Sequence, residues 1–509
     1  MDRRHRGASV WGLGRKSPPL PAGGGSELTP LSVAGGPRSD PRDPPLARCP
    51  LRWSRSVAAC RWPDPPGIDT ARALPWACPV LTGACTMSPK LRILYLNENS
   101  SFPFDNRARR EMGTLREAGA EITVICPAFE GGPGWDGCQR SPGRVSVEEY
   151  DGHEIWYYPF PEYGHSLAGH LREYAESLVW LQRLSWRALR RKGFDAVYAV
   201  NPPDLLWPIA AQFQVLGKKF IFDHYDLNPE LFQDRFGDNP RAMRALPLVK
   251  LMEKATITVA DHVISTNGSY RRIAIERCGK NPEQVTIVRN GPDMQRFYPV
   301  DPDPEARAMG DIVVGYLGNM NPQDGLDEVV EMARILRYEH GRTDIGYVLV
   351  GQGDSYEEVR AMRDAKGLGD CMLMPGRLPM ERVRACLSAA DICVQPDPPG
   401  GLNNVSTMNK VMEYMAMGKP VIAHQLKETM VSGGDVARYT ATPDARGLAD
   451  EVLALADDPD LRAELGRRGL ERCRDVLAWP HQAPCLLSVF ERLFPGFAPE
   501  HRDARPILE

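Results

Sequence analysis

The sequence predicts an α/β protein in which two Rossmann-like halves face each other across a cleft. Short apolar runs alternate with helical stretches in two separate parts of the chain, roughly residues 90–295 and 310–480. The segment between them, residues 298–311, is rich in Pro and Asp and has no apolar period, as expected of an interdomain linker. A chain of 509 residues is also longer than one ordinary hydrophobic core requires.

The composition is that of a soluble globular protein, with 42% hydrophobic and 25% charged residues. A formal net charge of -4 argues against nucleic acid as a partner. No apolar run is long enough to span a membrane. The twelve cysteines are scattered, and no two of them have the two-residue spacing of a metal or redox site. We therefore expect a cytoplasmic protein whose cysteines are small core residues.

Residues 1–86 differ from the rest of the chain, because they are rich in Pro, Gly and Arg and keep no strand or helix period. We predict that they form a disordered extension. Met87 directly precedes "SPKLRILYLNENS", where the ordered pattern begins, so we expect translation to start there.

The first half begins with a strand at 92–97, followed by a helix, a turn at Gly119 and a second strand. A Gly-rich loop at 131–144 and a long helix over roughly 167–192 come next. The remaining strand candidates are "AVYAV", "KKFIFDHYD", "DHVISTNGS" and "QVTIVRNGPD". Each run leads directly into Asn, Asp or Gly, and ligands of open parallel sheets bind beyond the carboxyl ends of the strands. These polar ends are where we expect the site.

The second half repeats this alternation. Its five strand candidates are "IVVGYLG", "IGYVLVGQG", "CMLMPG", "DICVQPD" and "KPVIAHQ". The apolar stretch "QAPCLLSVFERLF" follows the second half, and we expect residues 481–495 to form a final helix that returns to the first half.

The stretch "NKVMEYMAMGKPVIA" predicts a helix with Glu413 among apolar neighbours. At 100° per residue, Lys410 and Glu413 share one face and Met412 and Met415 lie on the other. Taken alone, this polar face indicates either a solvated Lys–Glu pair or a surface that binds a ligand.

Six stretches, in order, resemble the glycosyltransferases of family 4, which have the GT-B fold. They are "FPFDNRARREMGTLREAGAEITVICP", "IVRNGPDMQRFYP", "GYLGNMNPQDGLD", "LVGQGD", "LPMERVRACLSAADICVQPD" and "STMNKVMEYMAMGKPVIA". The resemblance covers about residues 90–490 and implies a retaining enzyme that transfers a sugar from a nucleotide diphosphate donor to a hydroxyl acceptor. It also implies that no metal and no cofactor are required.

The resemblance assigns donor-binding roles in the second half. Glu413 matches a glutamate that binds the ribose hydroxyls. The other residues expected near the donor nucleotide are Gly318 and Asn319 after one strand, Gly351 and Gly353 after the next, and Ser406 and Thr407 at a helix start, where phosphate is favoured.

The sequence also departs from the family. Asn319 and Asp324 stand where the family has Arg and Lys, and Val405 replaces the first of two glutamates. Candidates for the missing positive charge are Lys410, Arg377 and Arg289, of which we favour Lys410 because it shares a face with Glu413.

In the first half, the resemblance points to His224 as a catalytic residue that contacts the reacting sugar, with Asp226 or Asp223 holding its tautomer. Asp105 and Arg107 are expected on the acceptor side. We interpret Asp204 as a helix cap and residues 301–303 as solvated linker.

The expected acceptor is a saccharide or a lipid-linked molecule, in the assembly of a surface polysaccharide or glycolipid. The basic helix at 177–193 is either a crossover helix that covers the sheet or a peripheral contact with the inner face of the membrane. Two alternatives remain open: a nucleotide-sugar epimerase or hydrolase, and a catalytically silent nucleotide-sugar-binding protein, which the missing Arg and Lys favour.

Overall fold

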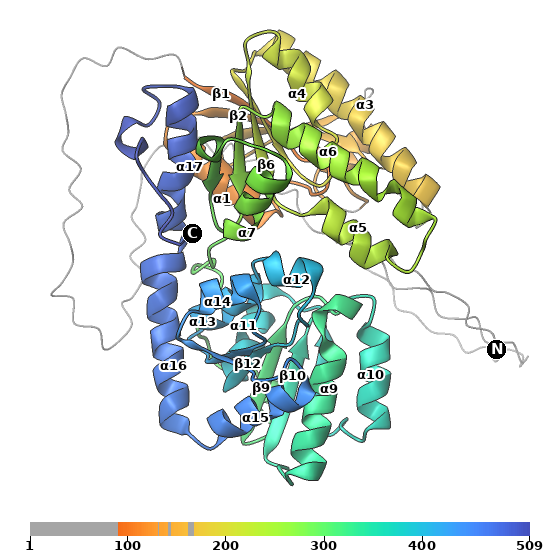
Figure 1. The fold of residues 1–509 in the computed structure, drawn as a ribbon, viewed down its shortest axis with the longest axis vertical. Coiled ribbons are helices and arrows are strands. Elements are labelled where there is room, and N and C mark those ends of the chain that lie inside the picture. The colour runs from red at the N-terminus through yellow and green to blue at the C-terminus, as the bar shows by residue number, and fades with distance from the viewer. Residues whose placement is uncertain (1–89, 131, 141–143, 161–166, 509) are drawn as a thin grey trace, which may run out of the picture. The chain divides into compact units, whose positions relative to one another are not determined.

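The computed structural model describes residues 90–508 apart from 131, 141–143 and 161–166. The predicted disordered extension and the expected start at Met87 lie outside the described residues. The described residues form two β-sheets (Figure 1). We call the larger sheet and its helices the N-lobe and the smaller sheet and its helices the C-lobe.

The N-lobe sheet has eight strands in the order β3-β4-β2-β1-β5-β6-β7-β8. The strands are β1 (Arg92–Leu96), β2 (Glu121–Ala128), β3 (Ser146–Tyr150), β4 (His153–Pro159), β5 (Ala196–Val200), β6 (Lys219–His224), β7 (His262–Ser265) and β8 (Val285–Ile287). All neighbours pair in parallel except β3 and β4, which are antiparallel. The carboxyl ends of the parallel strands therefore lie along one edge.

Both faces of this sheet are covered. Because side chains alternate along a strand, Ile93 and Tyr95 of β1 pack on one face and Leu94 and Leu96 on the other. The first face is covered by α1 (Asn106–Glu117) and α17 (Trp479–Leu493). The second is covered by α3 (Leu167–Arg191), α4 (Trp207–Gln214) and α6 (Leu246–Val259). Figure 1 shows that α17, from the far end of the chain, stands beside α1.

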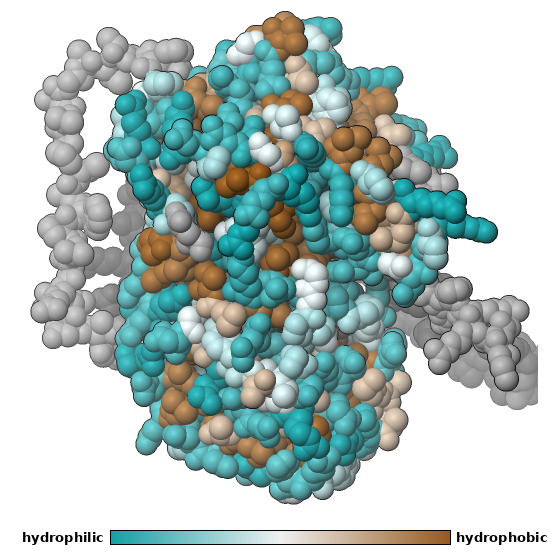
Figure 2. Space-filling model, in the orientation of Figure 1, coloured by the Kyte–Doolittle hydropathy of each residue, from teal (hydrophilic) through white to brown (hydrophobic). Residues whose placement is uncertain are grey.

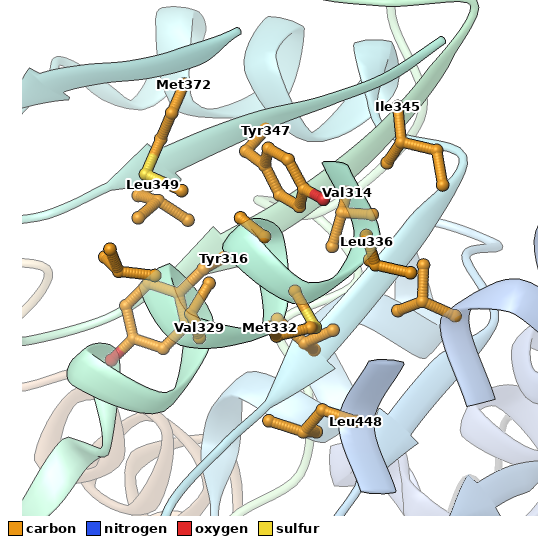
Figure 3. Packing of buried hydrophobic residues seen from close by; sticks show 14 of the residues in the cluster. Val314, Tyr316, Val329, Met332, Leu336, Ile345, Tyr347, Leu349, Met372 and Leu448 are labelled. Atoms are coloured by element: carbon orange, nitrogen blue, oxygen red, sulfur yellow. The ribbon is translucent and has the colours of Figure 1, made fainter. Parts of the chain in front are cut away.

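The C-lobe sheet has six parallel strands in the order β11-β10-β9-β12-β13-β14. The strands are β9 (Ile312–Leu317), β10 (Ile345–Val350), β11 (Met372–Gly376), β12 (Ile392–Gln395), β13 (Val421–Ala423) and β14 (Ala437–Tyr439). Figure 3 shows Tyr316 and Tyr347 of this sheet packing with Val329 and Met332 of α9 (Leu326–Arg334) and with Leu448 of α15 (Ala445–Ala456). The prediction of two Rossmann-like halves is confirmed.

Three local predictions were wrong. The Gly-rich loop at 131–144 contains a short helix, α2 (Trp135–Arg140). Asp303 is not solvated: it is the N-cap of α8 (Pro304–Arg307), accepting hydrogen bonds from two backbone amides, and it pairs with Arg382 at 3.0 Å. Asp204 does not cap α4, whose N-cap is Leu206; its carboxylate instead accepts hydrogen bonds from Asn201 and Asn228.

Helix α3 packs as a crossover helix. Leu181, Leu184 and Ala188 are buried in the N-lobe core, and the guanidinium of Arg187 lies 5.2 Å from the ring centroid of Trp156. Within the described part of the chain, no helix combines the length and apolar composition needed to cross a bilayer. On the face shown in Figure 2, brown hydrophobic patches are separated by hydrophilic residues.

The cysteines behave as core residues. Those predicted to lie in apolar elements are all buried and free: Cys126, Cys278, Cys371, Cys386 and Cys393.

Candidate active site

Glu413 lines a pocket between the two lobes. It lies on α13 (Asn409–Ala416) of the C-lobe, whose buried face, including Met412 and Met415, packs into the core. The pocket has a volume of about 170 Å³. Its lining from the N-lobe side comprises Asn106, Arg107 and Arg110 of α1, Tyr225 after β6, and residues 290–293 after β8. Of the polar face that the helical period predicted, Asn409 and Glu413 line this pocket, together with Met412, whereas Lys410 does not.

The environment of this carboxylate suits a hydrogen-bonding ligand. Burial raises the pKa of Glu413 from 4.5 to about 7, although Arg296, Lys410 and Arg110 oppose the shift. Among the described residues, none donates a hydrogen bond to it. A half-buried carboxylate with free acceptor capacity can receive the two hydroxyls of a vicinal diol.

Arg107 is not free to bind an acceptor. Its guanidinium is 1% exposed and makes two 3.0 Å hydrogen bonds to Asp223, and it also donates to the Val288 carbonyl and to Asn290. Its Nη2 lies 2.9 Å from Glu111 as well. All of its donor groups are engaged within the N-lobe, while the residue also lines the pocket; the acceptor-side role of Arg107 stays a prediction.

Asp105 also has a structural position. It is the N-cap of α1 and accepts hydrogen bonds from the backbone amides of Arg107 and Ala108. The hydroxyl of Tyr225 donates a third hydrogen bond to it, at 3.0 Å. Its oxygens therefore hold the loop between β1 and α1 in place.

His224 ends strand β6 at the carboxyl edge of the N-lobe sheet, where the sequence places it. The ring is fully buried and stacks on Phe222 at a centroid distance of 5.8 Å. Its Nε2 lies 3.6 Å from Glu253 of α6, a residue that the sequence reasoning did not single out. Of the two expected tautomer partners, Asp223 binds Arg107, and no hydrogen bond joins Asp226 to the imidazole among the described residues. Glu253 is therefore the carboxylate that faces the imidazole.

Asp226 lies two residues beyond His224 and is half-buried. Burial raises the pKa of its carboxyl from 3.8 to about 6, while His224 lowers it. A carboxyl that titrates near neutral pH at the carboxyl edge of a parallel sheet is a candidate for proton transfer.

Lys410 is already paired. Its ammonium lies 2.9 and 3.0 Å from the two oxygens of Asp397 and 3.3 Å from Asp324. Asp397, which sequence reasoning missed, follows β12. The positive charge that we favoured for phosphate binding is thus compensated by two carboxylates, one of them at the position where the family has Lys.

The glycines after β9 and β10 pack against each other. The Gly318 amide donates to the Val350 carbonyl at 3.1 Å, so it is not free to reach a phosphate. A Cβ on Gly351, which has a φ of 145°, would lie 1.8 Å from the Gly318 carbonyl oxygen. Gly353 lies similarly close to Met320: a Cβ at position 353 would be 2.6 Å from the Met320 carbonyl oxygen. These glycines therefore allow the two strand ends to meet.

Two predicted residues at this edge are open to solvent. Asn319 is exposed, and so is Arg377, which follows β11. No hydrogen bond or ion pair joins the Arg377 side chain to another described residue. Arg289, in contrast, is buried and pairs with Glu428 at 2.8 Å. Of the three candidate cations, only Arg377 is free within the described chain.

Ser406 and Thr407 contact the N-lobe. The hydroxyl of Tyr270 lies 3.0 Å from Ser406 Oγ, and Asn267 donates to Thr407 Oγ1 at 3.1 Å. Sequence reasoning missed Tyr270 and Asn267, whose only signal is their place in the polar end "STNGSY" after β7.

Among the residues that the structure describes, no three His, Cys, Asp or Glu side chains are grouped to hold a metal ion. Metal independence remains a prediction.

Solved structures share this fold. The chain matches sucrose-phosphate synthase from Thermosynechococcus elongatus with a TM-score of 0.59 at 18% identity, covering 80% of this chain and 99% of that one. It matches HepE of Anabaena in complex with UDP with a TM-score of 0.55 at 14% identity, covering 79% and 99%. The fold is that of the GT-B glycosyltransferases.

Sequence relatives agree with this class. The alpha-maltose-1-phosphate synthase of Mycolicibacterium smegmatis is 28% identical over 48% of this chain and 66% of its own length. The D-inositol 3-phosphate glycosyltransferase of Nocardia farcinica is 25% identical over 47% and 54%. The chain thus spans about two thirds of the first relative and about half of the second.

Two family models match in tandem. "Glycosyltransferase Family 4" covers residues 106–296, and "Glycosyl transferases group 1" covers residues 311–458. The chain belongs to glycosyltransferase family 4, as the sequence motifs predicted.

Proposed function

We propose that the protein transfers a sugar from a nucleotide diphosphate donor to a hydroxyl acceptor with retention of anomeric configuration. The observation that carries this proposal is the position of Glu413, whose carboxylate faces the pocket between the lobes and receives no hydrogen bond from the described residues. In this family the matching glutamate binds the donor ribose, and the pocket offers that carboxylate to a diol.

The chemistry requires stabilisation of a departing diphosphate while the sugar passes through an oxocarbenium-like state. In the proposed mechanism His224 contacts the sugar, and Glu253 orients the imidazole from 3.6 Å. The departing phosphate oxygen receives the acceptor proton on the same face of the sugar, so that no separate general base and no metal is needed. Burial raises the pKa of Asp226, and the charge of the nearby His224 ring opposes this shift.

The proposed acceptor is a saccharide or a lipid-linked molecule of surface polysaccharide or glycolipid assembly, reached from the cytoplasm. Peripheral contact with the inner membrane face belongs to the same proposal, because the outward side of α3 exposes Arg183, Arg190 and Val179. Flotation with anionic vesicles tests this part: wild type is expected to float and R183E/R190E to remain in solution.

The main test is a thermal-shift panel of UDP, GDP and ADP sugars on wild type and E413Q. A ligand at 100 times its Kd stabilises the fold by about 2.7 kcal/mol. We expect one nucleotide class to raise the Tm of wild type, and E413Q to respond much less. If no donor shifts wild type, the proposal is wrong.

Turnover then separates the reaction types. The proposal predicts donor consumption that depends on an acceptor extract, with an α-linked product from an α-linked donor, as read by NMR of the anomeric proton. Donor consumption without acceptor would indicate an epimerase or hydrolase. Binding without any turnover would indicate a silent nucleotide-sugar-binding protein.

A further inference from the structure

The start of helix α7 (Gly268–Arg272) in the N-lobe reaches residues 405–407 of the C-lobe. Asn267 caps this helix by accepting a hydrogen bond from the Tyr270 amide at 2.8 Å. Its Nδ2 donates to the Val405 carbonyl at 3.0 Å and to Thr407 Oγ1 at 3.1 Å. The hydroxyl of Tyr270 lies 3.0 Å from Ser406 Oγ. Two neutral, buried side chains of the N-lobe thus converge on one short segment of the C-lobe.

This segment lies just before α13, where a diphosphate is favoured by the helix start and where the family resemblance expects it. The cationic groups of the family are missing, since Asn319 and Asp324 occupy their positions. Lys410 is compensated by Asp397 and Asp324. Of the candidate cations in the described chain, Arg377 remains free after β11, and hydrogen bonds from neutral groups are available to share in holding a diphosphate here.

Polar atoms without partners gather around Tyr270. Among the described residues, His224 Nδ1, Ser265 Oγ and Ser269 Oγ are buried without a hydrogen-bond partner, whereas His224 Nε2 faces Glu253 at 3.6 Å. The His224 and Tyr270 rings are 5.4 Å apart, and Ser265 and Ser269 lie at the end of β7 and in α7. Buried polar atoms are almost always hydrogen-bonded in folded proteins. A ligand rich in hydroxyl or phosphate oxygens would complete them.

We propose that Tyr270 and Asn267 bind the diphosphate of the donor, turning their O–H and N–H groups from Ser406 and Thr407 to phosphate oxygens. This inference rests on the proposed function and adds to it a set of neutral N-lobe donors in place of the missing cations. Burial raises the pKa of Tyr270 well above its usual value, so the phenol remains a hydrogen-bond donor throughout the physiological pH range.

The test compares Y270F with wild type by calorimetry, using UDP against uridine, GDP against guanosine and ADP against adenosine. Y270F removes one oxygen and keeps the ring that packs on His224. The matched control is Y338F, because Tyr338 is 56% exposed and its hydroxyl bonds only to the Lys366 and Gly367 carbonyls. We expect Y270F to weaken binding of the nucleoside diphosphate about tenfold and to leave nucleoside binding unchanged, since a hydrogen bond to a charged group is lost. Y338F should match wild type in both.

A second variant, N267D, tests the same inference if Y270F folds poorly. N267D retains the cap oxygen of α7 and replaces the N–H donor with a charged oxygen, so it should weaken diphosphate binding at least as much. Equal or tighter diphosphate binding by both variants would overturn the inference, and tighter binding would show that the contact closes the site. If wild type binds none of UDP, GDP and ADP, the proposed function itself fails, and the inference fails with it.

Discussion

The guanidinium of Arg289 lies 2.8 Å from the carboxylate of Glu428, and the two side chains are 1% and 2% exposed. Arg289 follows β8 of the N-lobe, whereas Glu428 lies on α14 (Lys427–Gly433) of the C-lobe. The second oxygen of Glu428 accepts a hydrogen bond from the Ser269 amide at 3.0 Å. Burial lowers the pKa of Arg289, although Glu428 opposes this. The pair joins the two lobes and is almost completely buried.

Glu428→Gln should therefore destabilise the protein strongly. The substitution leaves a buried guanidinium without its counter-charge, which typically costs about 3 to 5 kcal/mol. Urea denaturation measures the change in the free energy of unfolding. The control is Glu471→Gln, which breaks an exposed pair with Arg467 and should cost less than about 0.5 kcal/mol. Equal effects of the two substitutions would contradict a buried, energetically coupled pair.

Nucleotide binding should strengthen as the pH rises through about 7. Burial raises the pKa of Glu413 to about 7, so the carboxylate, which is the better acceptor for a diol, is populated above that pH and protonated below it. Calorimetric titrations between pH 6 and pH 8 measure this dependence. The nucleotide's own phosphates also titrate, and the same titrations on E413Q measure the pH dependence of binding that they cause. An identical pH dependence in both proteins would show that Glu413 does not titrate at the site.

Removing the charge of Asp324 should improve diphosphate binding. Asp324 lies 3.3 Å from the Lys410 ammonium and compensates part of its charge. With Asp324→Asn, Lys410 would attract a diphosphate more strongly, and we expect a three- to tenfold gain in UDP or GDP affinity at low salt, which is about 1 kcal/mol. Asp327→Asn, on the exposed side of α9, is the matched control and should change nothing. Weaker binding by Asp324→Asn would mean that Lys410 does not face the diphosphate.

Gly351→Ala should destabilise the protein far more than Gly341→Ala. Both glycines have a positive φ, of 145° and 69°, but only at 351 would a Cβ meet another atom, at 1.8 Å from the Gly318 oxygen. Backbone strain alone costs about 1 to 2 kcal/mol, and the collision adds roughly 1 to 3 kcal/mol. Chemical denaturation compares the two variants. Similar losses would mean that the ends of β9 and β10 can separate freely.

The sequence predicts the central strands well, because their apolar pattern follows from burial on both faces. All five residues of β5 are buried, so "AVYAV" is a continuous apolar run. The edge strand β3 has only Ser146 buried, and its exposed residues leave no pattern to detect. Helix α2 is short and lies between glycines, which are typical of loops.

The sequence predicts the orientation of a site residue where the helical period sets it. It does not predict the pairing of a side chain with a residue that is distant in the chain. Met412 and Met415 fix one face of α13 in the core, so Glu413 faces the pocket. The burial of Arg107 depends on Asp223, which is 116 residues away in the chain. The pairing of Lys410 with Asp397 depends in the same way on the packing of α13 beside β12. A single sequence carries no record of such pairs.

The most direct test of the account measures whether Glu413 recognises the ribose diol. Calorimetry would compare a nucleoside diphosphate with its 2′,3′-dideoxy analogue on wild type and E413Q. We predict that wild type prefers the ribonucleotide by about 1.5 to 3 kcal/mol, the range for hydrogen bonds to a charged group, and that E413Q loses most of this preference. If E413Q prefers the ribonucleotide as strongly as wild type does, Glu413 does not bind the ribose, and the central claim is contradicted.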